Sequence, residues 1–156
     1  MNEAWFSALG EPLGAAERGE IAAYLQGLGM AAPVDAVSSW AQAARICQGA
    51  AGPWWDAEEA ERAQLEKRAR LDPADSHWLA LNEALHGAAA VAAARAGCAD
   101  AAYIRAAAGS AAYAAYEARL ARAAGMPEGH PFLRKYALYC GGRWPLGVYH
   151  GRFAIF

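Results

Sequence analysis

This chain of 156 residues has few cysteines, no excess of basic residues and no long apolar run. The three cysteines, Cys47, Cys98 and Cys140, contain no C-x-x-C pair, which excludes a disulfide scaffold and favours reduced thiols. The formal net charge of −2 gives the whole chain no general attraction for nucleic acid or anionic lipid. No apolar stretch approaches the ~20 residues that span a bilayer, and no basic region of a signal peptide opens the chain. These absences predict a cytoplasmic protein with no nucleic-acid or membrane partner.

Sequence motifs of catalysis and of cofactor binding are also lacking. The chain has no glycine-rich phosphate loop, no dinucleotide-binding fingerprint after a strand and no G-x-S-x-G nucleophile motif. Glu83 and His86 form one E-x-x-H pair, whereas a carboxylate-bridged di-iron bundle needs two such pairs and further carboxylates. We therefore expect no metal ion and no cofactor, and the sequence favours a binding protein over an enzyme.

Alanine is the residue that the chain has in abundance. Hydrophobic residues make up 56% of the sequence, and about half of them are alanines. Alanine has the highest helix propensity but adds little apolar area to a core. The larger apolar surfaces come from six tryptophans, seven tyrosines and four phenylalanines. This composition predicts a mainly α-helical single domain over residues 1–156, with closely packed helices held by aromatic anchors.

Glycine and proline divide the chain into six or seven predicted helices. We place them at residues 2–9, 13–28, 33–48, 56–71, 75–96, 100–124 and 130–139. The short connection between the fifth and the sixth makes them an alanine-rich antiparallel hairpin at the centre of the bundle. Pro33 is expected in the first turn of its helix, with Val34 and Val37 on the apolar face. The GPWW segment before Asp56 is expected to be a loop.

The last part of the chain changes to a period of two, which predicts a β-hairpin over about residues 143–156. His150 and Gly151 suit the two central positions of a tight turn, because both tolerate positive φ better than a β-branched residue does. The register that follows pairs Tyr149 with Arg152, Val148 with Phe153, and Leu146 with Ile155. A lone hairpin is marginally stable in water, so we expect its apolar face to pack on the helices.

Four polar residues fall on the facing sides of the predicted helical hairpin, namely Asn82, His86, Ser110 and Glu117. A rotation of about 100° per residue places them among alanines, so we expect them to be buried between the two helices. One interpretation is a pocket in which they hold a small ligand. The other is a polar network that fixes the register of the helices, because buried polar groups need hydrogen-bond partners.

The predicted helix at residues 56–71 carries most of the charge, with acids at its start and bases at its end, as the helix dipole favours. Its apolar face consists mainly of alanine, with Leu65 to one side, so we expect this helix on the outside of the bundle. Tryptophans often anchor protein interfaces. The hypothetical partner surface therefore comprises Trp54, Trp55, Glu59, Arg62 and Lys67, and the alternative is a solvated charged helix.

Arg143 and Arg152 are candidates for an anion-binding patch near the C-terminus, with ordinary solubilising charge as the alternative. For the whole chain, the sequence predicts binding of another protein, as in an inhibitor, a toxin-neutralising protein or an adaptor. The competing hypothesis is a small-molecule-binding protein or an enzyme that uses the polar cluster. No feature of the sequence indicates a particular oligomeric state.

Overall fold

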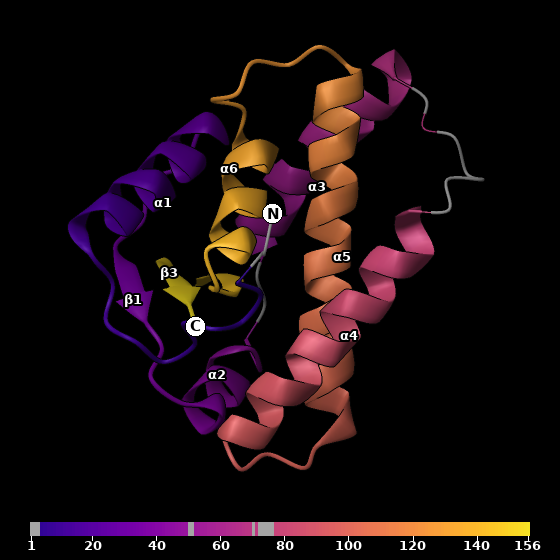
Figure 1. Cartoon of the computed structure of the whole chain (residues 1–156). Coiled ribbons are helices and arrows are strands. Elements are labelled where there is room, and N and C mark those ends of the chain that lie inside the picture. The colour runs from indigo at the N-terminus through magenta and orange to yellow at the C-terminus, as the bar shows by residue number, and fades with distance from the viewer. Residues whose placement is uncertain (1–3, 50–51, 70, 72–76) are drawn as a thin grey trace.

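The computed structural model describes residues 4–49, 52–69, 71 and 77–156, and this part of the chain is mainly α-helical (Figure 1). Its helices are α1 (Ala15–Gly27), α2 (Trp40–Ile46), α3 (Gly52–Arg68), α4 (His77–Arg95), α5 (Ala101–Ala123) and α6 (Pro131–Cys140). Its strands are β1 (Val34–Ala36), β2 (Pro145–Tyr149) and β3 (Arg152–Ile155). The predicted helical fold with a C-terminal β-hairpin is confirmed. None of the described helices combines the length and apolar character needed to cross a membrane.

Helix α5 forms the centre of the molecule. It packs on α4 and on α6, and α6 packs in turn on α1 (Figure 1). The buried face of α5 consists almost entirely of alanine, with Tyr103, Glu117 and Leu120 as larger members. Small side chains let the neighbouring helices approach closely, which explains why an alanine-rich hairpin can form a core. Asp100 caps α5 by accepting a hydrogen bond of 2.8 Å from the amide of Ala102.

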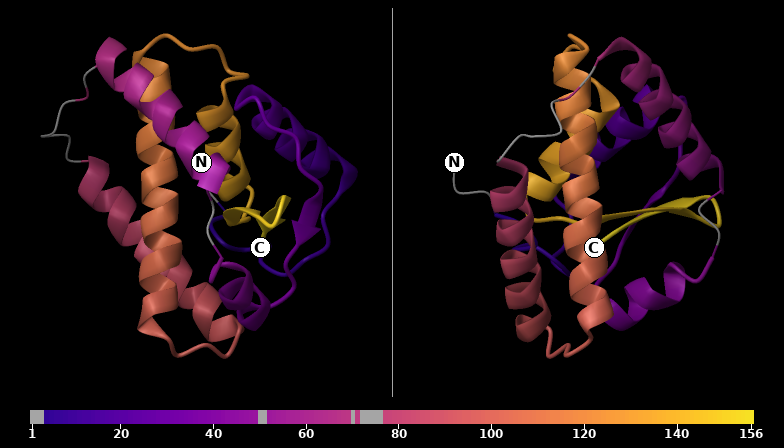
Figure 2. Two further views of the ribbon diagram at one scale, coloured as in Figure 1. Left: turned by 180° about the vertical axis from the view of Figure 1, so that it is seen from behind. Right: turned by 90° about the vertical axis from the view of Figure 1, so that its right-hand side faces the viewer.

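The hairpin of β2 and β3 runs across the axis of α5 (Figure 2). Its turn is as predicted, with positive φ of 52° at His150 and 73° at Gly151. The pairs Tyr149–Arg152 and Val148–Phe153 are confirmed as well. The pairing of Leu146 with Ile155 is wrong, because a bulge between Pro145 and Gly147 shifts the register.

Close packing on Trp54 explains the bulge. Gly147 has φ of 122°, and a Cβ atom there would lie 2.7 Å from Cζ3 of Trp54. The strand therefore bends around the indole ring, and a glycine is needed at the point of contact. Leu146 then joins the core cluster of Trp144, whereas Val148 and Phe153 pack in the cluster of α1. The apolar side chains of the hairpin are thus divided between two cores.

Residues 34–36 form a strand instead of the start of a helix. Strand β1 pairs in parallel with β3, which lies between β1 and β2 in the sheet. Helix α2 begins at Trp40, and Ser39 caps it by accepting a hydrogen bond from the amide of Gln42. Val34 and Val37 have helical spacing, but β3 offers their segment a hydrogen-bonding edge that outweighs this local pattern.

Two other boundaries also differ from the prediction. The described residues of the predicted first helix, 4–9, lie in turns and non-helical backbone. Helix α3 begins at Gly52 instead of Asp56, so the GPWW segment is its first turn and not a loop. Proline is compatible with a first helical turn because the amide it lacks would have no partner there. The predicted helix start at residues 75–76 and the first residues of the chain, 1–3, lie outside the described residues.

Candidate functional site

Three charged side chains from three helices meet in the interior. Glu58 of α3, Glu117 of α5 and Lys135 of α6 are 3%, 1% and 4% exposed. Lys135 Nζ lies 2.7 Å from Glu58 Oε1 and 2.7 Å from Glu117 Oε2. We call these three residues the interior charge cluster. Two carboxylates share one ammonium, so the cluster carries an excess negative charge when both carboxylates are ionised.

Aromatic side chains enclose and partly satisfy the interior charge cluster. The Tyr24 hydroxyl donates a hydrogen bond of 2.5 Å to Glu58 Oε1 and accepts one of 2.7 Å from the indole N–H of Trp54. Lys135 Nζ also lies 5.8 Å from the centre of the Trp54 ring and 5.6 Å from that of Phe132, within range of a cation–π interaction. Glu58 Oε1 therefore accepts hydrogen bonds from both Tyr24 and Lys135.

Glu117 is the least satisfied member of the cluster. Apart from its ion pair with Lys135, no group in the described part of the chain donates a well-aligned hydrogen bond to either carboxylate oxygen. Burial raises the pKa of Glu117 to about 7, and the charge of Glu58 adds to this, while Lys135 opposes it. Glu117 therefore exchanges its proton near neutral pH, so that the net charge of the cluster can change there.

A cavity of about 240 Å³ adjoins the interior charge cluster between α3, α5, α6 and β2. Glu58 and Lys135 line it, and six aromatic side chains form most of the remaining wall: Trp54, Trp55, Tyr113, Tyr139, Trp144 and Tyr149. We call it the aromatic cavity. A gap too narrow to admit a water molecule shares Trp55, Glu58 and Tyr113 with this wall and is also lined by Glu59, Arg62 and Glu117. Glu58 therefore lines the aromatic cavity, whereas Glu117 lines only the gap behind it.

The predicted polar cluster between α4 and α5 is divided in the structure. The expectation that His86 is buried is wrong: its side chain is exposed, and Nδ1 lies 2.8 Å from the carbonyl oxygen of Asn82. The Asn82 side chain donates a hydrogen bond to the Trp78 carbonyl of its own helix. Ser110 lines the aromatic cavity and contacts the Tyr139 hydroxyl, and Glu117 belongs to the interior charge cluster. The helical phase of α4 places Leu85 and Ala89 inward and His86 outward.

The predicted partner surface is only partly at the surface. Trp54 is 7% exposed and packs in the core, whereas Trp55 is 50% exposed. Arg62 forms ion pairs with Glu59 and Glu66 along α3, and Lys67 is exposed. The predicted alanine face is wrong, because the buried residues of α3 are Trp54, Glu58 and Leu65. Because α3 begins at Gly52 instead of Asp56, Trp54 is part of the helix and shares its buried side with Glu58 and Leu65.

Arg143 and Arg152 do not form an open anion site, because each is engaged with a carboxylate of the chain. Arg143 is 4% exposed, and its Nε lies 2.7 Å from Glu17 Oε1. It also donates to the backbone carbonyls of Ala8, Glu11 and Pro12. Arg152 forms two hydrogen bonds with Asp35 on the neighbouring strand β1. The sequence shows the positive charge but not these partners, which come from distant segments.

Sequence reasoning missed Glu58 and Lys135, although their spacing carries a signal. Glu58 lies four residues after Trp54 and seven before Leu65, so a helix that starts at Gly52 places all three on one side. Lys135 lies three residues after Phe132 and three before Leu138, within the apolar stripe of α6. A charged residue inside the apolar stripe of one helix indicates a buried ion pair when the apolar stripe of another helix contains a residue of opposite charge.

The chain matches no protein-family model, no curated protein and no solved structure with significant similarity. Among the described residues, no three His, Cys, Asp or Glu side chains gather so that they could hold a metal ion. The interior charge cluster and the aromatic cavity therefore provide the basis for inferring function.

Proposed function

We propose that the protein binds a small organic cation, of the quaternary or alkylammonium class, in the aromatic cavity. The observation that carries this proposal is the combination of six aromatic side chains with the buried carboxylate of Glu58 in one cavity wall. Aromatic faces attract cations through the ring quadrupole, and this attraction is stronger where water is excluded.

The charge balance supports a cation over an anion. Glu58 and Lys135 line the cavity, and Glu117, which does not line it, shares the single ammonium of Lys135 with Glu58. An incoming cation supplies the second positive charge, so that both carboxylates can be ionised together. An anion would instead add a third negative charge in a region of low dielectric constant, where such charges repel strongly.

The size of the cavity limits the ligand. A space of about 240 Å³ is below the range of about 300–1,000 Å³ typical of drug-sized ligands. It suits a compact ammonium compound with few heavy atoms, and tetramethylammonium is the simplest probe of this class.

The test is calorimetric titration with tetramethylammonium at pH 8. We expect saturable binding that weakens at least tenfold in Glu58→Gln, because the variant removes the buried charge. Trp55→Leu removes one ring at the exposed rim and is expected to weaken binding about fivefold, in line with about 1 kcal/mol for a cation–π contact. Glu83→Gln, on the exposed side of α4, is the matched control and should bind normally. Equal binding by Glu58→Gln and Glu83→Gln, with Trp55→Leu also unaffected, would contradict the proposal.

Binding of another protein is a second proposal, and the exposure of Trp55 favours it. The Trp55 ring lies 6.4 Å from that of Trp54, and it is a large aromatic side chain at the rim of a cavity, as is common for interface anchors. The test is affinity capture from native lysate with wild type and Trp55→Ala as baits. A partner that wild type retains and Trp55→Ala loses supports this surface, and a partner retained equally by both contradicts it.

A further inference from the structure

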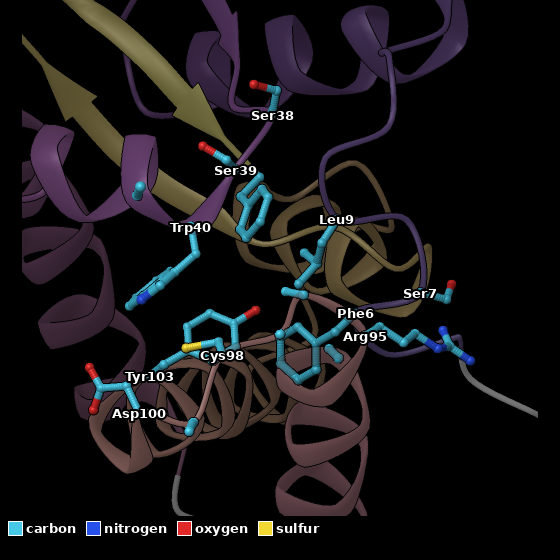
Figure 3. A pocket seen from close by; sticks show the side chains of 16 residues that line it. Phe6, Ser7, Leu9, Ser38, Ser39, Trp40, Arg95, Cys98, Asp100 and Tyr103 are labelled. Atoms are coloured by element: carbon cyan, nitrogen blue, oxygen red, sulfur yellow. The ribbon is translucent and has the colours of Figure 1, made fainter.

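A second and larger cavity lies at the N-terminal end of α5, away from the interior charge cluster. Its volume is about 760 Å³. Three parts of the chain form its walls: the N-terminal segment with Phe6 and Leu9, the start of α2 with Trp40, and the connection from α4 to α5 around Cys98 (Figure 3). We call it the N-terminal cavity.

The phenol of Tyr103 is an unpartnered polar group at this cavity. Tyr103 is 0% exposed, and no group in the described residues hydrogen-bonds with its hydroxyl. Figure 3 shows the phenol oxygen pointing from α5 into the space between Trp40, Leu9 and Phe6. A buried hydroxyl without a partner costs about 1–3 kcal/mol, so a partner supplied by a ligand would recover this loss. Burial raises the pKa of Tyr103 to about 12, which keeps the phenol protonated and able to donate.

The opposite wall is strained. Phe6 is 2% exposed and has φ of 56°, a left-handed conformation that bulky side chains rarely adopt. Its ring packs edge-on against Tyr139 and Trp144, and this packing holds the conformation in place. Residues held in such conformations cluster at binding and catalytic sites.

The polar groups at the rim favour a neutral ligand. Arg95 and Asp100 both line the cavity, so one positive and one negative charge offset each other there. The rest of the wall combines the aromatic rings of Phe6, Trp40 and Phe156 with Leu9, several alanines and three serines. The wall thus fits an apolar molecule that offers one oxygen to Tyr103.

We propose that the N-terminal cavity is a second binding site, for a neutral and mainly apolar small molecule whose carbonyl oxygen accepts a hydrogen bond from Tyr103. The two cavities have no lining residue in common, although Trp144 of the aromatic cavity packs against Tyr103 and Phe6.

The experiment compares 4-phenylbutan-2-one, a ketone, with butylbenzene, a hydrocarbon of similar shape, by two-dimensional NMR titration. We expect the ketone to bind wild type about fivefold more tightly than the hydrocarbon, with shift changes concentrated in residues 95–103. Tyr103→Phe should lose this preference, because the ring remains and the donor is removed. The same variant should unfold at a urea concentration at least as high as wild type, because it removes an unsatisfied hydroxyl.

Tyr116→Phe is the matched control, since the Tyr116 hydroxyl donates to Glu66 outside the cavity, and it should keep the preference for the ketone. Equal affinities of wild type and Tyr103→Phe for the ketone would overturn the proposal. Absence of saturable ketone binding, or shift changes located away from residues 95–103, would overturn it as well.

Discussion

At the scale of single residues, the structure depends on a few side chains whose surroundings are unusual for their type. Glu117 is a carboxylate in the interior, and Gly147 is a glycine pressed against an indole ring. Arg143 is a buried arginine that holds three backbone carbonyls. Glu117 lies in α5, Gly147 in β2 and Arg143 in the connection between α6 and β2. Each packs near one of the proposed sites, so each connects stability with the shape of a cavity.

The raised pKa of Glu117 predicts that stability decreases as the pH rises. The folded protein keeps the proton up to a pH of about 7, whereas the unfolded chain releases it near 4.5. Between these values the folded state binds more protons, so the free energy of unfolding falls with increasing pH, by up to about 3 kcal/mol. Glu117→Gln should remove this dependence: in urea titrations it should match wild type near pH 4.5 and exceed it at pH 8. A variant that is less stable than wild type at pH 8 would contradict this assignment.

Gly147→Ala is predicted to destabilise the fold. The new methyl group would meet Trp54 at 2.7 Å, and φ of 122° is strained for alanine, so we expect a loss of more than about 2 kcal/mol. Gly109→Ala is the control, because Gly109 lies in α5 with no atom within 4 Å of the added Cβ. That control should gain up to about 1 kcal/mol from helix propensity. Urea unfolding checks both, and a Gly147→Ala variant as stable as the control would show that Trp54 does not constrain the bulge.

At the scale of elements, the features that the sequence predicts best are those determined locally. The turn at His150 and Gly151 and the helical hairpin both follow from residues a few positions apart. Strand β1 and the bulge could not be predicted in this way, because β1 depends on β3 and the bulge on Trp54, both distant in sequence. The interior charge cluster shares this limit, since its three members come from three helices and their meeting depends on the tertiary fold.

Strand β3 is the central strand of the sheet, and its removal is expected to destabilise the whole chain. Deleting residues 153–156 takes the partner from both β1 and β2 and removes Phe153, which is 0% exposed. Loss of one buried phenylalanine side chain alone costs about 3–5 kcal/mol. We expect the truncated chain to melt far below the full chain, or not to fold, as followed by circular dichroism. A melting temperature equal to that of the full chain would show that the hairpin is a detachable appendage.

At the scale of the whole molecule, the N-terminal segment is fixed to the C-terminal half. The amide of Ala4 donates to the Cys140 carbonyl, and that of Ala8 to the Gly142 carbonyl. Arg143 adds its contacts with Ala8 and with Glu17, whose pKa the guanidinium lowers. These contacts close the wall of the N-terminal cavity and connect both ends of the chain.

Arg143→Ala should therefore loosen this wall. We expect a loss of about 3 kcal/mol, because several backbone carbonyls lose their donor, and faster hydrogen exchange in residues 4–12. Arg143→Lys should not restore protection, since an ammonium cannot reproduce the planar fork of the guanidinium. Arg152→Ala, at an exposed pair with Asp35, is the control and should leave the exchange of residues 4–12 unchanged. Exchange in these residues that is equal in wild type and Arg143→Ala would refute the role of Arg143 as the clamp.

The molecule as a whole is proposed to recognise positive charge in the aromatic cavity, and one comparison of ligands tests this most directly. Choline and 3,3-dimethylbutan-1-ol have nearly the same shape, but only choline is charged. We expect calorimetry at pH 8 to show choline binding to wild type at least tenfold more tightly than the neutral alcohol. Equal affinities, or tighter binding of the alcohol, would contradict a cation site built from the aromatic rings and Glu58.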